Sequence, residues 1–167
     1  MYPVLSEPMA FAPGIDREDK ESSVTVEMLY RELSSGSEAG EISSPSTLLD
    51  DVSNALFPGE EVSLDESVVK GNLDAVLLAL VATQDHNTHG KGLMETLATA
   101  FGAEFSPGTV YPSLHDLEEE GCLETRELVR TKEYAVDDEE LSRERVAAAA
   151  RQHLLLGAFL QQVAGEL

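Results

Sequence analysis

The stretch SPGTVYPSLHDLEEEG, Ser106 to Gly121, has the pattern of a short helix with marked ends. Ser106 is a favourable helix N-cap, and Pro107 suits the first helical position because its missing N–H has no partner there. Gly121 is expected to end the helix. Apolar residues recur at spacings of four and three, which predicts one buried face made of Val110, Leu114 and Leu117.

The opposite face of this helix carries small, hydroxyl and aromatic side chains. Its members are Gly108, Thr109, Tyr111, Pro112, His115 and Glu119. Such a first turn is shaped for close approach, as a recognition helix approaches a DNA groove. A capped surface helix without function has the same sequence pattern, so the neighbouring elements must decide between the two interpretations.

The preceding segment predicts two more helices. Asn72 is positioned to cap a helix whose apolar residues, from Leu73 to Val81, follow the 3.6-residue period. A polar turn over Thr83–Thr88 leads to a second helix from about His89 to Ala100, and Gly102 follows as a stop signal. Two helices joined by a short connection at this spacing form the helix-turn-helix pattern.

Two extended segments follow Gly121. The first starts at Cys122, the second covers Lys132–Val136, and a turn near Arg130 and Thr131 joins them. Three helices followed by a β-hairpin predict a winged helix-turn-helix, a mainly α fold with a small β-hairpin (α+β). The winged-helix domain is assigned to residues 67–137.

Residues 138–167 are assigned to a C-terminal dimerisation helix. Acidic residues Asp137–Glu140 suit the positive end of its dipole, and the helix is expected over Leu141–Glu166. Apolar residues step by three and four along one side, as in a coiled-coil seam. The predicted dimer contacts are Val146, Ala149, Leu156, Phe159, Leu160 and Val163. Folding back onto the chain's own core is the alternative use of this face.

Acidic residues dominate the composition, with 32 Asp and Glu against 11 Lys and Arg and a net charge of −21. An acidic, lysine-poor surface resembles the proteins of microbes that accumulate salt inside the cell. An acidic interaction tail on a protein from an ordinary environment is the alternative. The single cysteine, Cys122, excludes an internal disulfide and is expected in the core as a small hydrophobe.

Residues 1–66 hold five prolines and 15 acidic against 3 basic residues, a net charge of −12. This composition predicts an acidic, largely disordered N-terminal extension. Two apolar islands interrupt it, Val24–Leu33 and Thr47–Phe57, and the second has a helical period. Each island is interpreted either as a segment that folds on a protein partner or as a transient helix without function.

Several functional classes lack support in the sequence. We find no membrane span, no secretory signal, no phosphate loop and no nucleophile elbow, so a cytoplasmic protein without membrane contact, catalytic residues or a cofactor is expected. Asp85, His86 and His89 share one turn, but two histidines and a carboxylate without further clustered ligands do not predict a metal. The run Glu118–Glu120 is interpreted as a solvated face, because consecutive helical positions point in different directions.

With these elements in place, Val69–Val136 resembles the PadR family of winged-helix transcriptional regulators, in a haloarchaeal form. Three blocks carry the resemblance: KGNLDAVLLALV at Lys70–Val81, HGKGL at His89–Leu93 and the stretch Ser106–Gly121. The resemblance implies a repressor that dimerises through its C-terminal helix and occludes a near-palindromic operator in double-stranded DNA.

The resemblance also implies roles for individual residues. Thr109, Tyr111, Pro112 and His115 would face the major groove, with Ser106 and Gly108 near the DNA backbone. The wing would bring Arg126, Arg130 and Lys132 to phosphates. His89 and Gly90 are expected to shape the start of the second helix rather than to contact DNA.

The chain departs from the family pattern in charge. Family members usually carry a basic residue where this chain has Asp116, and often an aromatic residue where it has Lys91. Lys70–Val136 contains 5 basic and 11 acidic residues, which argues against tight DNA binding at low salt. At about 1 M salt the Debye length is near 3 Å, so repulsion is screened beyond contact range. The alternative function is a winged-helix adaptor that binds protein and has weakened or lost its affinity for DNA.

Overall fold

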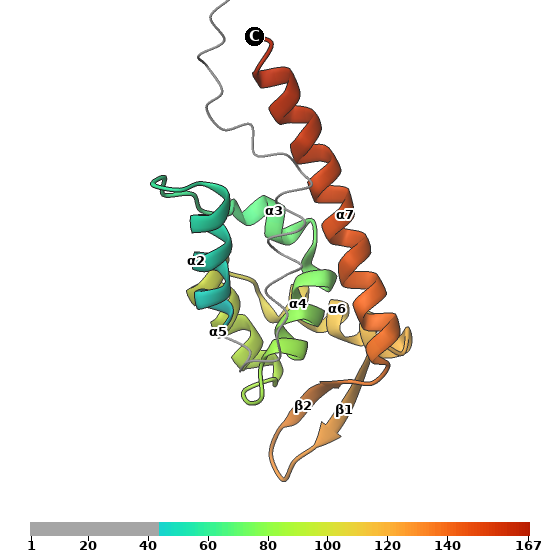
Figure 1. The fold of residues 1–167 in the computed structure, drawn as a ribbon. Coiled ribbons are helices and arrows are strands. Elements are labelled where there is room, and N and C mark those ends of the chain that lie inside the picture. The colour runs from blue at the N-terminus through green and yellow to red at the C-terminus, as the bar shows by residue number, and fades with distance from the viewer. Residues whose placement is uncertain (1–43) are drawn as a thin grey trace, which may run out of the picture.

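The structure is a computed structural model that describes residues 44–167, and the predictions for residues 1–43, the Val24–Leu33 island among them, lie outside this range. Its elements are α2 (Pro45–Leu56), α3 (Glu66–Lys70), α4 (Leu73–Thr83), α5 (Gly90–Phe101), α6 (Pro107–Glu119), β1 (Leu123–Glu127), β2 (Lys132–Val136) and α7 (Glu139–Ala164) (Figure 1). Three helices followed by a two-stranded hairpin form the winged-helix order, which confirms the predicted fold class.

One hydrophobic core lies between α4, α5, α6 and the start of the hairpin. Helix α4 is apolar on most of its surface, as expected of a helix surrounded by other elements. The fully buried side chains include Leu77, Leu78, Leu93, Leu97, Val110, Leu114 and Leu117. The predicted inner face of Ser106–Gly121 is therefore confirmed, and its burial orients the other face of α6 outward.

Both ends of α6 follow from local chemistry. Ser106 adopts an extended conformation as N-cap, its carbonyl accepts from the N–H of Thr109 and Val110, and Pro107 occupies the first turn. At the other end Gly121 has a φ of 79°, and the N–H of Cys122 donates to the carbonyl of Leu117. This is the Schellman arrangement, in which a left-handed residue lets the chain reverse over the last turn.

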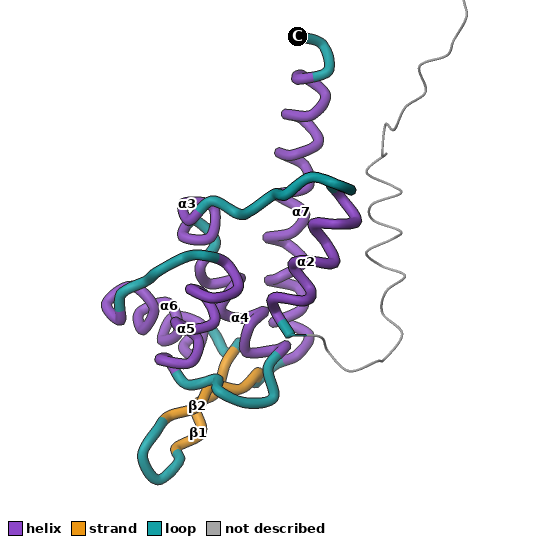
Figure 2. Tube along the Cα trace, turned by 90° about the vertical axis from the view of Figure 1, so that its left-hand side faces the viewer, coloured by secondary structure: helices purple, strands orange, loops and turns teal. Residues whose placement is uncertain are grey.

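The hairpin is antiparallel, with Leu123 opposite Val136 and Glu127 opposite Lys132. A backbone bond between the Leu128 N–H and the Thr131 carbonyl, 2.8 Å long, closes its turn. The base of the hairpin is held by the loop before α5, since the Tyr134 N–H donates to the Thr88 carbonyl at 3.2 Å. The hairpin projects from one end of the helical body, as the tube in Figure 2 shows.

Helix α7 has two different halves. Asp138 caps its start by accepting from the Leu141 N–H at 2.9 Å, and the Ser142 hydroxyl donates to the Cys122 carbonyl at 3.1 Å. Arg145 forms ion pairs with Asp74 and Glu120. The first half packs against α4, whereas the second half extends beyond the helical body at the end opposite the hairpin (Figure 1).

This division changes one expectation for the dimer contacts. Val146, predicted to lie in the intermolecular seam, packs against the core of its own chain. Ala149 is half-buried. The exposed apolar side chains come later in the helix: Leu155, Leu156, Phe159, Leu160 and Val163. The reason is that the first half of α7 packs against the core and the second half extends beyond it. One apolar stripe therefore has a part that faces the core and a part that is exposed.

Helix α2 lies in the segment expected to be largely disordered. It confirms the helical period of Thr47–Phe57, and the Ser44 side chain caps its start by accepting from the Thr47 N–H. The helix lies beside α5 with Leu49, Val52 and Leu56 half-buried (Figure 1). None of the helices within residues 44–167 has the length and apolar character needed to cross a membrane.

Cys122 occupies the core position predicted for it, with 1% of its surface exposed. Burial raises the pKa of the Cys122 thiol, so very little reactive thiolate forms near neutral pH. We expect iodoacetamide at pH 8 to label the folded protein at least about tenfold more slowly than the denatured chain. Mass spectrometry measures both rates, and equal rates would contradict the burial of this thiol.

Candidate nucleic-acid interface

The outer face of α6 carries the side chains that the sequence assigned to DNA contact. Tyr111, Pro112 and His115 are exposed, as are Ser106 and Gly108 at the start of the helix. Thr109 is half-buried, and its hydroxyl shares a 3.1 Å hydrogen bond with that of Ser106. The structure therefore gathers the predicted residues of α6 on one accessible surface.

The HGKGL block positions Tyr111. His89 caps α5, because its Nδ1 accepts from the Gly92 N–H at 2.9 Å, so the prediction that His89 shapes the start of this helix is confirmed. The Tyr111 ring lies against Gly90, and a Cβ at this glycine would come within 2.6 Å of two ring carbons and the phenolic oxygen. The absence of a side chain at Gly90 thus lets the ring pack against the first turn of α5.

A groove of about 590 Å³ separates α6 from the wing. Tyr111 and His115 line it from α6, Arg130 and Lys132 line it from the hairpin, and Lys91 lines it from α5. The structure therefore brings two of the three predicted wing residues to the same groove as Tyr111 and His115 of α6. Arg126 does not line the groove.

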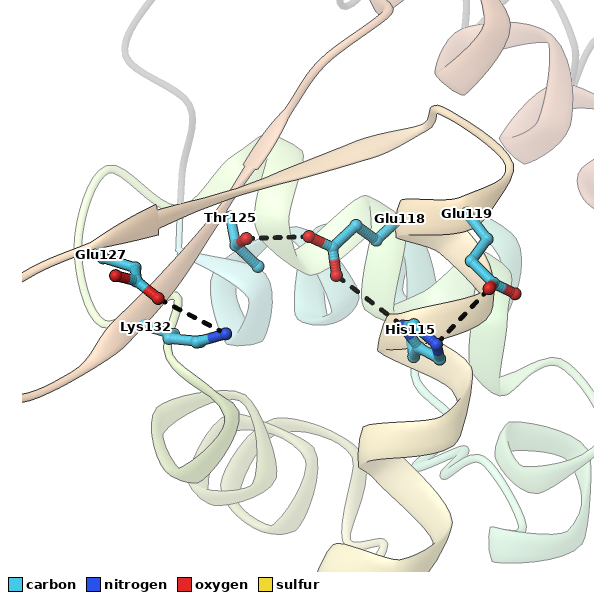
Figure 3. Close-up of polar contacts among 6 residues, drawn as sticks. All are labelled: His115, Glu118, Glu119, Thr125, Glu127 and Lys132. Atoms are coloured by element: carbon cyan, nitrogen blue, oxygen red, sulfur yellow. Dashed lines mark hydrogen bonds and ion pairs between the residues drawn. The ribbon is translucent and has the colours of Figure 1, made fainter.

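Glu118 connects α6 to the wing. The Thr125 hydroxyl donates to one of its carboxylate oxygens at 2.8 Å, and His115 Nδ1 lies 3.8 Å from the other (Figure 3). Glu119 Oε1 lies 3.5 Å from His115 Nε2. The predicted solvated face is thus wrong for Glu118, which is half-buried and hydrogen-bonded, and Glu120 pairs with Arg145.

Tyr134 lies on the floor of the groove with 8% of its surface exposed. Its pKa is raised, chiefly by burial and further by the Glu118 carboxylate and Tyr111. The phenol therefore stays neutral and adds no negative charge to the groove. Tyr134 lies in a predicted strand, but no role was predicted for it, because a single tyrosine in a short strand carries no sign of a neighbouring helix.

The basic residues of the wing differ in their partners. Arg126 donates two hydrogen bonds to Glu124, and Lys132 Nζ lies 3.7 Å from Glu127. Within residues 44–167, Arg130 forms no ion pair. Exposed pairs of this kind contribute little stability, so a phosphate can compete for Lys132. Arg130 is accordingly the wing cation most available to a ligand.

Asp85, His86 and His89 do not form a metal site in the part of the chain that the structure describes, since no three potential ligands gather there. The groove and the outer face of α6 remain as the candidate site. Its basic and aromatic side chains, beside an exposed helix start, are those expected of a surface that contacts nucleic acid.

Comparison with known proteins shows what the domain resembles. Residues 77–139 match the transcriptional regulator PadR-like family. This part of the chain is similar to a PadR-like domain. The matched range begins inside α4 and ends at the first residue of α7, so it contains the whole of α5, α6 and the wing.

Curated relatives of the chain come from haloarchaea. It is 38% identical over 101 residues to the transcriptional activator GvpE1 of Halobacterium salinarum, and these residues make up 60% of this chain and 52% of that protein. It is 38% identical over 99 residues to the transcriptional activator GvpE of Haloferax mediterranei, 59% of this chain and 51% of that protein. The chain spans about half the length of these relatives. Their origin agrees with the acidic composition.

Two solved structures are similar to part of the chain. The complex structure of hsRosR-S4 has a TM-score of 0.41 and 21% identity, covering 61% of this chain and 95% of that chain. Pex from Synechococcus has a TM-score of 0.36 and 17% identity, covering 62% of this chain and 96% of that chain. The family and the curated relatives are named for transcriptional regulation rather than catalysis, in agreement with the lack of a catalytic motif.

Proposed function

We propose that this protein is a DNA-binding transcriptional regulator of a high-salt cytoplasm. The observation that carries the proposal is the common surface formed by the outer face of α6 and the wing, with Arg130 and Lys132 across a groove from Tyr111 and His115. A recognition helix beside a basic wing is the arrangement with which winged helices contact a major groove and the adjacent backbone.

Within this proposal, the residues of α6 divide by their position. Thr109, Tyr111, Pro112 and His115 face the major groove, and Tyr111 and His115 offer polar groups that can hydrogen-bond to base edges. Ser106 and Gly108 lie at the helix start, where N–H groups and the serine hydroxyl suit a phosphate. The small Gly108 leaves space for the DNA backbone, since a Cβ there would meet only the Ser106 Oγ, at 3.8 Å.

High salt is part of the mechanism. Asp116 and Glu119 are exposed on α6 and would repel phosphates in dilute buffer. At about 1 M salt the screening length falls to near 3 Å, so only charges in contact with DNA still matter. Local cations in the groove then outweigh a net charge of −21 spread over the whole chain. The haloarchaeal relatives support this setting.

The sign of regulation is proposed from the relatives. The PadR resemblance implies repression by operator occlusion, whereas the matching haloarchaeal proteins are named transcriptional activators. We favour activation, because these relatives match 60% and 59% of the chain at 38% identity. A reporter gene under the bound promoter separates the two signs: deletion of the protein should lower expression, and an increase would establish repression instead.

A mobility-shift assay in multimolar KCl tests DNA binding directly. Genomic fragments selected by the purified protein are expected to shift, and an unrelated fragment of equal length should shift only at a higher protein concentration. Lys70 lies in α3, outside the groove, so a Lys70→Ala variant should bind like the wild type. Failure of the wild type to shift any promoter fragment, together with no change in vivo for Tyr111→Ala, would reject the proposed function.

We also propose that the protein is a homodimer that places two copies of α6 in successive major grooves of a near-palindromic site. The support is the exposed apolar face in the second half of α7, which includes Leu156, Phe159 and Leu160. An apolar face of this size on a soluble protein usually contacts a partner, and a second copy offers the same face.

Leu160→Glu tests this dimer. A buried carboxylate at the seam is expected to weaken the dimer by about tenfold or more. Gln161→Glu adds the same charge at the next, exposed position and should leave the dimer intact. Light scattering in multimolar KCl measures the mass of both variants. A wild-type monomer at micromolar concentration would contradict the paired-groove arrangement.

A protein-binding adaptor remains the second candidate, favoured by one observation. Four large apolar side chains are exposed in and after α2: Leu48, Phe57, Val62 and Leu64. They lie in the N-terminal segment for which an additional protein partner was expected. A partner that survives nuclease treatment in a pull-down, and is lost for a Leu48→Asp, Phe57→Asp variant that still binds DNA, would support this second role.

A further inference from the structure

The cations of this acidic chain are unevenly placed. Residues 44–167 contain eight Lys and Arg, and three of them, Lys91, Arg130 and Lys132, line the groove between α6 and the wing. They come from three separate segments: the first turn of α5, the turn of the hairpin and the start of β2. Only the tertiary fold brings them together, since 41 positions separate Lys91 from Lys132.

The groove offers donors rather than acceptors. Besides the three cations, Tyr111 and Thr131, which carry hydroxyl groups, also line it. The one carboxylate in its lining, Glu118, already accepts the hydrogen bond from Thr125 and lies beside His115. A surface with several positive charges and hydroxyl donors matches the phosphate groups of a nucleic acid strand, which are acceptors only.

Each of the three cations can reach such a ligand without breaking a strong interaction. Arg130 forms no ion pair among the described residues. The Lys91 and Glu95 side chains are 78% and 59% exposed, and their charged atoms lie 3.7 Å apart. The pair between Lys132 and Glu127 is as long and similarly exposed. Exposed lysine pairs of this length contribute little stability.

We propose that this groove holds the phosphate backbone of one DNA strand and that Lys91, beside Arg130 and Lys132, is a direct phosphate contact. The inference rests on the proposed function and deepens it. A DNA strand fits better than a free phosphate ion, because a volume of about 590 Å³ with cations at separate points of its lining accommodates successive phosphates. The base-reading side chains of α6 then meet the adjacent major groove.

The test compares Lys91→Ala with Lys70→Ala on one operator fragment and one unrelated fragment. Lys91→Ala is expected to weaken binding by about three- to tenfold on both fragments, since a phosphate contact carries no sequence information. The slope of log affinity against log salt should fall by about one, the value for one lost phosphate contact. Lys70→Ala should change neither quantity.

A second measurement locates the contact. A series of duplexes, each with one neutral methylphosphonate in place of a phosphate, is titrated with both proteins. At one position the methylphosphonate should lower the DNA affinity of the wild type and leave the affinity of Lys91→Ala unchanged. The reason is that the pair of charges is already lost in that variant. The absence of any such position would overturn the assignment of Lys91.

The outcomes separate the two proposals. If the wild type binds no DNA, the proposed function fails. If the wild type binds DNA and Lys91→Ala behaves like Lys70→Ala, the function stands and only this inference is overturned. A third result, in which millimolar inorganic phosphate stabilises the wild type but not Lys91→Ala while DNA binding is unchanged, would make the groove a small-anion site and overturn the DNA strand as its occupant.

Discussion

Gly92→Ala is expected to destabilise the domain by about 3 kcal/mol or more, the upper range for overpacking a tight site. A Cβ at Gly92 would lie 2.5 Å from two side-chain atoms of Asn87 and closer still to its backbone carbonyl oxygen. The Asn87 backbone has little freedom to move away. It already has a φ of 67°, and the next residue, Thr88, accepts a hydrogen bond from the wing.

Thermal unfolding in multimolar KCl, followed by circular dichroism, measures this effect. For a domain of this size, a loss of 3 kcal/mol lowers Tm by roughly 10 °C. Gly108→Ala is the matched control, since a Cβ there has only one neighbour, at 3.8 Å, and alanine is the better helix former. Equal melting temperatures for Gly92→Ala and Gly108→Ala would contradict the tight packing of the α5 start.

Tyr111→Ala is expected to lower DNA affinity by about tenfold or more, because a good base contact contributes roughly 1–3 kcal/mol of discrimination. The ring is 45% exposed, so its removal leaves the core intact. It lies against Gly90 at the edge of the groove, which holds it in one place before DNA arrives. A side chain held in this way loses less conformational entropy on binding.

Two further variants assign the cause of that loss. Tyr111→Phe keeps the ring and removes the hydroxyl. A DNA affinity close to that of Tyr111→Ala would therefore show that the hydroxyl makes the contact. Gly90→Ala keeps Tyr111 but displaces its ring, and should reproduce part of the loss. Operator titrations by fluorescence anisotropy measure all three. Wild-type affinity for Tyr111→Ala, with an unchanged circular dichroism spectrum, would exclude Tyr111 from the interface.

Most of the element order was predictable, because caps, glycines and apolar periods act over a few residues. The limits of α6 illustrate this. Ser106, Pro107 and Gly121 mark its ends through backbone conformations that each residue type favours, and the spacing of Val110 and Leu114 selects its buried face. The second apolar island likewise became α2, since its period is local too.

The environments of Glu118 and Val146 were less predictable. Glu118 was wrongly assigned to a solvated face, and Val146, whose place in a dimer seam stays a prediction, packs against the core of its own chain. Both assignments came from patterns that show only that a residue shares a side of its helix. Which neighbour lies against that side depends on contacts between distant segments. The pairing of Glu118 with Thr125 across the helix–wing junction and the contact of Tyr111 with Gly90 have no signature in the sequence near either residue.

The sequence by itself determined the three helices and hairpin, the inner face of α6 and the acidic charge, because these follow from properties of adjacent residues. Only the tertiary structure decided that Lys91, Arg130 and Lys132 share one groove and that α7 divides into a core-packed half and an exposed half. The physical reason is that a groove consists of side chains from separate elements, and their meeting depends on how those elements pack around the common core.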